Sequence, residues 1–145
     1  MHAGRWDRSS LLGSEIKGRT LGIIGLGRIG GEVAIRARAF GMEVIAYDPY
    51  IAQTRFETLR VQSIASLEAL LEQSNIVTVH TPLTDETTGM IGKREIARLP
   101  QQAIVVNMST VAACISILWR WTHSHGGIKH PALRRCLCST QWKRS

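Results

Sequence analysis

Residues 21–30 have the sequence LGIIGLGRIG, which predicts the end of a buried β-strand, a glycine turn and the start of a helix. In this pattern Gly25 permits a tight turn, Gly27 leaves no side chain in the path of a pyrophosphate, and Gly30 lets the helix pack close to the strand. The N-terminus of such a helix offers backbone N–H groups and the positive end of its dipole to phosphates. The stretch therefore predicts a dinucleotide-binding βαβ unit.

The residues on both sides of the turn fit the same unit. Thr20–Ile24 is the expected strand, a short apolar run typical of a buried parallel sheet. The helix continues from Ile29 and ends near Gly41. Its predicted buried face is formed by apolar residues at helical spacing: Ile29, Val33, Ala37 and Phe40.

The second strand, Glu43–Tyr47, ends at Asp48. This acid lies about 20 residues beyond the glycines, where a carboxylate accepts hydrogen bonds from the adenosine ribose. It would repel the 2′-phosphate of NADP, and Pro49 and Tyr50 follow it in place of an arginine. The sequence therefore predicts NAD as the cofactor, against the simpler alternative of an aspartate that caps a turn.

Strands and helices alternate through the rest of the ordered part. The expected elements are a short third strand at 61–62, a helix at 67–73 capped by Ser66, a strand at 76–80, a helix at 93–99 and a strand at 103–107. This alternation predicts an α/β fold, an incomplete doubly wound parallel sheet with an irregular C-terminal tail. Ligands are expected at the carboxyl ends of the strands: Gly25, Asp48, Thr81 and Asn107. His80 also lies at a strand end, but a packing or hydrogen-bonding role is favoured over a catalytic one.

Several segments, in this order, resemble the NAD-binding domain of the D-2-hydroxyacid dehydrogenases over residues 3–109. Within that family, the match is best to members that act on 3-phosphoglycerate. The segments are AGRWDR (3–8), KGRTLGIIGLGRIG (17–30), FGM (40–42), YDP (47–49), VHTPL (79–83) and VVN (105–107).

The resemblance implies roles for individual residues in NAD binding. The backbone of Arg28 and Ile29 would face the pyrophosphate, and Thr81 and Pro82 would line the adenine side of the groove. Met108 and Ser109 stand where the family's chain passes the nicotinamide. The full predicted cofactor-binding set is Gly25, Gly27, Arg28, Ile29, Gly30, Asp48, Thr81, Pro82, Met108 and Ser109.

The resemblance stops after Ser109. The family continues with an Arg-Gly pair whose arginine binds the substrate carboxylate, followed by a glutamate and a histidine that act as acid and base; here Thr110 and Val111 follow instead. Residues 96–145 contain no Asp or Glu, so no catalytic residue is assigned. Family members also carry a substrate-binding domain before the AGRWDR segment. We therefore expect a linker remnant at 1–17, a partial NAD-binding domain at 18–109 and a non-family tail at 110–145.

The tail also differs in composition. It holds six of the 18 Lys and Arg residues, all three Cys and three of the four Trp, but none of the 11 acids. The overall charge of +7 is therefore almost wholly a property of the tail. Thr-Val-Ala-Ala-Cys can be encoded so that a two-base shift gives Arg-Gly-Gly-Val, the continuation that the family resemblance implies. We hypothesise a frameshift at or just before codon 110. We expect strand 103–107 to be left as an open sheet edge, with partial cover by the apolar run at 111–119 as the open alternative.

The tail raises two further possibilities, neither favoured. Arg134-Arg135 and Lys143-Arg144 have the charge for nonspecific phosphate contacts. Residues 1–109 are nearly balanced in charge, so a nucleic-acid role is not expected. The tail's potential zinc ligands are spaced H-x-H and C-x-C, which does not match the usual finger spacing, so no metal is predicted. Those ligands are His123, His125, His130, Cys136 and Cys138.

Two function hypotheses remain. In the first, the chain is an NAD-binding fragment of an oxidoreductase that moves hydride between NAD and a 2-hydroxy acid, and it is inactive alone. In the second, it is a non-catalytic NAD-binding or interaction module that pairs as a homo-oligomer or with an intact paralogue. No apolar run is long enough to span a membrane, and residues 1–10 lack a secretory apolar region. A cytoplasmic location is expected by default.

Overall fold

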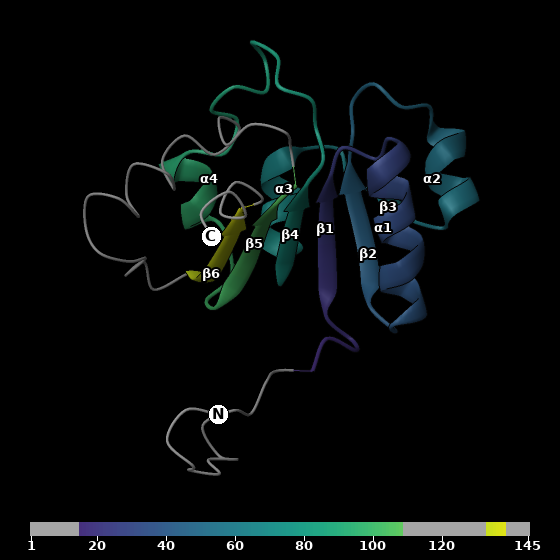
Figure 1. Ribbon diagram of the computed structural model, residues 1–145, viewed down its shortest axis with the longest axis horizontal. Coiled ribbons are helices and arrows are strands. Elements are labelled where there is room, and N and C mark those ends of the chain that lie inside the picture. Colours follow the sequence, from purple (N-terminus) through teal and green to yellow (C-terminus); the bar gives the residue numbers. More distant parts are fainter. Residues whose placement is uncertain (1–14, 109–132, 139–145) are drawn as a thin grey trace, which may run out of the picture.

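The computed structural model describes residues 15–108 and 133–138. Its six strands are all parallel and form one sheet in the order β3-β2-β1-β4-β5-β6 (Figure 1). This is the strand order of a doubly wound dinucleotide-binding fold, and it confirms the predicted fold class. The elements are β1 (Thr20–Ile24), α1 (Arg28–Ala39), β2 (Glu43–Tyr47), α2 (Gln53–Leu59), β3 (Gln62–Ser63), α3 (Leu67–Gln73), β4 (Ile76–Val79), α4 (Lys93–Ala97), β5 (Ala103–Asn107) and β6 (Leu133–Cys138).

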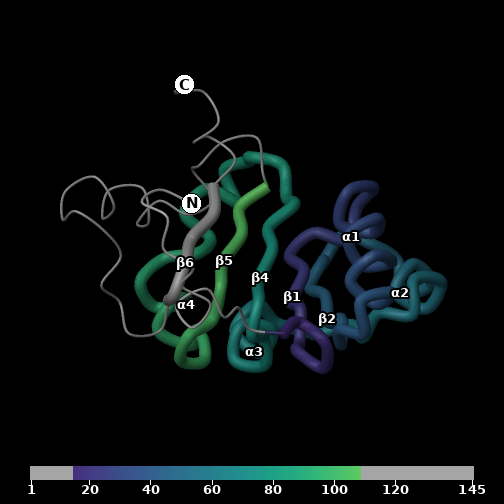
Figure 2. The backbone as a smooth tube through the Cα atoms, turned by 60° about the horizontal axis from the view of Figure 1, so that its bottom comes forward, coloured from purple at the N-terminus to yellow at the C-terminus, as the bar shows by residue number. Residues whose placement is uncertain are grey.

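Helices cover both faces of the sheet, α1 and α2 on one face and α3 and α4 on the other (Figure 2). Successive residues of β1 face opposite sides, so Ile23 packs with α1 and α2 while Ile24 packs with α3. Two apolar clusters result. The cluster under α1 and α2 includes Ala34 and Phe56, and the cluster under α3 and α4 includes Leu70. A strand buried on both faces explains the unbroken apolar runs in the sequence.

The register of the sheet brings the carboxyl ends of its central strands to one edge. Ile24 at the end of β1 pairs with Tyr47 of β2 and with Val79 of β4, and Val79 pairs with Asn107 of β5. The chain adds β2 and β3 on one side of β1 and then crosses over to add β4, β5 and β6 on the other side. The switch point therefore lies between the neighbouring strands β1 and β4. Ligands bind at such a switch point in doubly wound folds.

The buried face of α1 matches the predicted one only in part. Ala37 is buried and Val33 packs against the cluster under α1 and α2, as predicted, but Ile29 and Phe40 are 63% and 66% exposed. Gly30 is buried as well, and a Cβ atom there would lie 2.1 Å from a backbone oxygen of the glycine turn, so no larger side chain fits at that position. Apolar spacing therefore predicted part of this face and missed the small residue at the closest approach of the helix to β1.

Two other elements depart from the sequence prediction. Helix α2 was not predicted, since its N-cap Ala52 makes no side-chain capping bond and the segment is only 7 residues long. It is fixed by Phe56 and Leu59, which are buried in the cluster under α1. The predicted helix 93–99 ends at Ala97, and the predicted third strand is displaced by one residue, within the usual uncertainty of element ends.

The expected open edge at β5 is wrong. Strand β6 pairs in parallel with β5, with Val105 opposite Cys136 and Asn107 opposite Cys138. The expectation assumed that the tail lacks a sixth strand, because the tail does not match the family pattern. Backbone N–H and C=O groups pair whatever the side chains are, so an extended segment of unrelated sequence can still complete the sheet.

Candidate functional site

The glycine turn between β1 and α1 is built by close backbone contacts. Gly25 has a φ of 91°, which favours glycine. A Cβ atom placed on Gly25 would lie 3.1 Å from the backbone of His80 and Thr81, and one placed on Gly30 would lie 2.1 Å from the Gly25 carbonyl oxygen. The turn therefore needs glycine at positions 25 and 30 for the fold itself.

Gly27 differs from those two glycines because no described residue fills the space beside it. A Cβ atom there would meet no heavy atom of the described part of the chain within 4 Å. Gly27 is also the N-cap of α1, and this helix end has no side-chain cap and no acid in its first turn. The first N–H groups of the helix, including those of Arg28 and Ile29, therefore have no partner within the helix. The space and the donors together fit a phosphate group.

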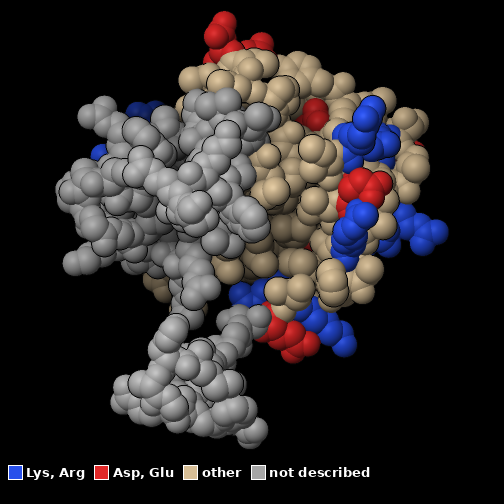
Figure 3. All heavy atoms as spheres, viewed as in Figure 1, with Lys and Arg blue, Asp and Glu red and all other residues tan. Residues whose placement is uncertain are grey.

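Helix α2 adds a positive charge to the glycine turn. The Arg55 guanidinium donates a hydrogen bond to the Gly27 carbonyl oxygen at 3.3 Å, and the side chain lies against Gly31. No sequence pattern predicted this contact, because α2 itself was not predicted. Figure 3 shows Lys and Arg side chains gathered on the α1 and α2 side of the molecule.

Asp48 lies beside the turn, as the motif requires, and its carboxylate already holds two backbone groups. One oxygen accepts a hydrogen bond from the Leu26 N–H at 2.8 Å, and the other accepts from the Tyr50 N–H at 3.1 Å. A carboxylate oxygen has two acceptor positions, so each keeps one for a further donor such as a sugar hydroxyl. The aspartate thus both stabilises the turn and presents acceptors to the groove.

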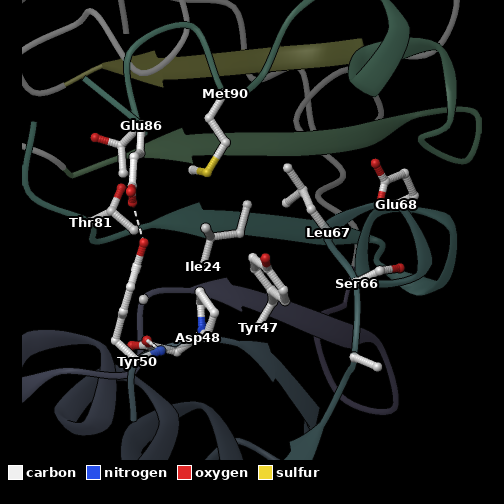
Figure 4. Close-up of a pocket in the computed structure, with 14 residues that line it drawn as sticks. Ile24, Tyr47, Asp48, Tyr50, Ser66, Leu67, Glu68, Thr81, Glu86 and Met90 are labelled. Carbon is white, nitrogen blue, oxygen red and sulfur yellow. Dashed lines mark hydrogen bonds between the residues drawn. The ribbon is translucent and has the colours of Figure 1, made fainter. Parts of the chain in front are cut away.

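A pocket of about 400 Å³ opens between the carboxyl ends of β1, β2 and β4 (Figure 4). Its apolar walls come from both sides of the switch point, with Ile24 and Tyr47 on the strands, Leu67 at the start of α3 and Met90 in the loop before α4. The Ser66 hydroxyl accepts a hydrogen bond from the Ala69 N–H at 3.2 Å and caps α3, as predicted. Flat apolar walls of this kind suit an aromatic base.

One side-chain hydrogen bond crosses one end of this pocket. The Tyr50 hydroxyl, from the loop after β2, donates to the carboxylate of Glu86, from the loop after β4 (Figure 4). This bond, together with the nearby negative charge, raises the pKa of Tyr50 above its ordinary value. Sequence analysis assigned neither residue to the site. The only local signal was the pattern Thr84-Asp-Glu-Thr87, whose two threonines hydrogen-bond to each other's backbone N–H groups and set the turn that carries Glu86.

The other predicted site residues are placed as follows. Thr81 lines the pocket, whereas Pro82 is exposed and does not line it. Met108 is 53% exposed at the end of β5, where its N–H donates to the Val79 carbonyl. Ser109 lies outside the described residues. The structure thus brings together the glycine turn, Asp48 and Thr81.

His80 occupies the end of β4 and is half-buried. Its Nε2 atom lies 3.0 Å from the Thr78 hydroxyl, and its buried Nδ1 atom has no hydrogen-bond partner among the described residues. Burial lowers the pKa of His80 below its ordinary value, so the ring is neutral at pH 7. This geometry agrees with the packing or hydrogen-bonding role favoured from the sequence.

Among residues 15–108, no three His, Cys, Asp or Glu side chains cluster in a way that could hold a metal ion. The tail histidines considered for zinc lie outside the described residues. None of the helices in the described part has the length and apolar character needed to cross a membrane.

Known proteins share both the sequence and the fold. The family model described as "D-isomer specific 2-hydroxyacid dehydrogenase, NAD binding domain" matches residues 1–113. The D-3-phosphoglycerate dehydrogenase of Methanocaldococcus jannaschii is 45% identical over 104 residues, which cover 72% of this chain and 20% of that protein. The enzyme of the same name from Bacillus subtilis is 48% identical over 102 residues, covering 70% of this chain and 19% of that one. The chain therefore spans about a fifth of the length of these relatives.

Solved structures agree with this match. The apo D-lactate dehydrogenase of Escherichia coli superposes with a TM-score of 0.75 at 25% identity, covering 90% of this chain and 40% of that one. The pyruvate reductase of Chlamydomonas reinhardtii superposes with a TM-score of 0.73 at 30% identity, covering 83% and 36%. With the NAD-binding motif in its expected geometry, the chain belongs to the D-isomer-specific 2-hydroxyacid dehydrogenase family and carries that family's NAD-binding domain.

Proposed function

We propose that the chain binds NAD in the groove at the carboxyl ends of β1, β2, β4 and β5. The pyrophosphate lies over Gly25, Gly27 and Gly30 and accepts hydrogen bonds from the N–H groups of Arg28 and Ile29. The observation that carries this proposal is the uncapped N-terminus of α1, beside which a Cβ at Gly27 would meet nothing within 4 Å.

The same proposal assigns the two ends of the dinucleotide. The adenosine ribose donates its hydroxyls to the acceptor positions that remain on Asp48. The adenine occupies the apolar pocket beside Thr81, with Pro82 next to it along the chain. Met108 and Ser109, at and after the end of β5, line the nicotinamide end.

The ancestral reaction is hydride transfer between NAD and a 2-hydroxy acid, and the names of the relatives point to 3-phosphoglycerate. Bound NAD supplies the hydride acceptor. The substrate needs a cation for its carboxylate and a general base for its hydroxyl. After Glu95 the sequence has no Asp or Glu that could orient such a base. We therefore propose that this chain binds the cofactor but does not turn over substrate alone.

Calorimetry on the full 145-residue chain tests NAD binding, and kinetics on the same chain test the proposed absence of turnover. Titration with NAD is expected to give saturable one-site binding, and Gly27→Val is the matched control because its side chain would fill the space left for the phosphates. Incubation with NAD and 3-phosphoglycerate is expected to produce no NADH. Absence of NAD binding would refute the cofactor assignment, and NADH formation above the Gly27→Val background would refute the inactivity.

A second function, pairing with an intact family member, is favoured by one feature of α1. Ile29 and Phe40 are 63% and 66% exposed, and eleven residues of helix place them on nearly the same face. A tagged intact D-3-phosphoglycerate dehydrogenase mixed with this chain would retain it on an affinity column if they pair. Ile29→Asp with Phe40→Asp is then expected to abolish retention, and equal retention of the variant would exclude this face.

A further inference from the structure

Among the described residues that line the pocket, the charged side chains all have one sign. They are the carboxylates of Asp48, Glu68 and Glu86, and no Lys or Arg is among these described lining residues. Arg55 lies at the Gly27 carbonyl and does not line the pocket. Figure 3 also shows acidic side chains at the tip of the loop after β4, which carries Asp85 and Glu86. The pocket therefore presents a negative field to any group that extends from the ribose.

A chain of hydrogen bonds links Glu86 to Asp48 through Tyr50. Tyr50 follows Asp48 by two residues, and its N–H donates to the Asp48 carboxylate at 3.1 Å. The hydroxyl of the same tyrosine donates to Glu86. Tyr50 thus spans the distance between the two carboxylates and ties the loop after β4 to the end of β2. Glu86 is itself exposed, and the bond to Tyr50 holds its carboxylate at one end of the pocket (Figure 4).

This arrangement bears on which dinucleotide the pocket accepts, and the argument rests on the proposed function, which puts the ribose at Asp48. A phosphate on the 2′-hydroxyl would extend from the ribose into the space that Asp48, Tyr50 and Glu86 surround. It would bring close to two negative charges toward two carboxylates, with no cation among the lining residues that the structure describes. We propose that Glu86, held in place by Tyr50, is a second carboxylate that rejects a 2′-phosphorylated dinucleotide, beside Asp48.

The experiment measures the ratio of the dissociation constants for NADP and NAD, by calorimetry on the full chain at low ionic strength, where surface charges are least screened. Glu86→Gln keeps an acceptor for Tyr50 and removes the charge, so the ratio is expected to fall about fivefold. The dissociation constant for NAD is expected to change by less than about twofold, since NAD has no 2′-phosphate. Tyr50→Phe frees Glu86 to turn toward solvent and is expected to lower the ratio by a smaller factor.

The matched control is Glu43→Gln, the same charge change at an exposed position at the opposite end of β2. A ratio in Glu86→Gln equal to that of Glu43→Gln, with NAD still bound, would overturn this inference and leave the proposed function standing. A wild-type chain that binds neither dinucleotide would overturn the proposed function and this inference with it. A thermal unfolding curve for each variant shows whether it is folded, and Tyr50→Phe carries the test if Glu86→Gln is not.

Discussion

Gly30 lies in direct contact with Gly25, its partner on the other side of the glycine turn. A Cβ atom on Gly30 would come within 2.1 Å of the Gly25 carbonyl oxygen and 3.3 Å of the Ile23 side chain. Because the first of these atoms belongs to the backbone, no side-chain rotation relieves the contact. The absence of a side chain at Gly30 thus lets the start of α1 lie against the end of β1. The fold and the proposed phosphate site depend on the same residue.

Replacing Gly30 with alanine is therefore expected to destabilise the protein. The helix must move away from β1 to admit the methyl group, at a cost of about 2–4 kcal/mol. Urea unfolding followed by circular dichroism measures it. Gly27→Ala is the control, since its Cβ meets nothing within 4 Å, and it is expected to lose no more than about 1 kcal/mol. Equal losses in the two variants would contradict this account of the turn.

Gly27→Val separates binding from stability. The side chain is expected to fill the open space at the N-terminus of α1 and to weaken NAD binding at least about tenfold, since lost charge-assisted hydrogen bonds are worth about 1.5–3 kcal/mol. Unfolding should change far less than in Gly30→Ala. Calorimetric titration with NAD gives the affinity, and unchanged affinity would mean that the pyrophosphate does not lie over this turn.

Ser66→Ala tests the cap of α3. The Ser66 hydroxyl accepts from the Ala69 N–H at 3.2 Å, and its loss is expected to cost about 1 kcal/mol in the free energy of unfolding. Ser63→Ala, at an exposed position on the two-residue strand β3, is expected to stay within about 0.5 kcal/mol of wild type. Urea midpoints of the two variants provide the comparison. Equal urea midpoints for the two variants would show that the Ser66 cap does not stabilise the protein.

His80 makes the stability depend on pH. Burial lowers its pKa in the folded protein, so between that value and the ordinary pKa near 6.5 the unfolded chain binds more protons. Stability contributed by the neutral ring is present above pH 6.5 and is lost as the pH falls below it. Thermal unfolding at pH 7.5 and 5.5 should show a larger decrease for wild type than for His80→Gln. A decrease of the same size in both proteins would assign the pH dependence to other groups.

Local patterns in the sequence were sufficient for much of the fold. The bounds of β1, β2, α3 and β5 follow from short apolar runs and the cap at Ser66, because these elements are specified by neighbours along the chain. Local patterns were not sufficient for the whole buried face of α1, because Ile29 and Phe40 have the spacing of a core face but are exposed. The close approach of α1 to β1 admits only small residues, and hydrophobic periodicity does not contain that distance.

The contacts that join distant segments could also not be predicted from the sequence. Tyr50 and Glu86 are 36 positions apart, and they meet because parallel strands bring their following loops to one edge of the sheet. Arg55 hydrogen-bonds to Gly27, 28 positions away, from helix α2, which has no side-chain N-cap that would have predicted it. Each of these side chains is exposed and polar, and nothing in the local pattern distinguishes it from an ordinary surface residue.

The sequence by itself determined the glycine turn, the acid at the end of β2 and hence the cofactor class, because a phosphate needs bare backbone at a helix N-terminus and a ribose needs an acceptor at a set distance along the chain. Only the tertiary structure decided which residues line the pocket at the carboxyl ends of β1, β2 and β4, which residues of α1 are buried and that β6 covers the edge of β5. Those outcomes depend on distances between elements that meet only when the sheet has formed.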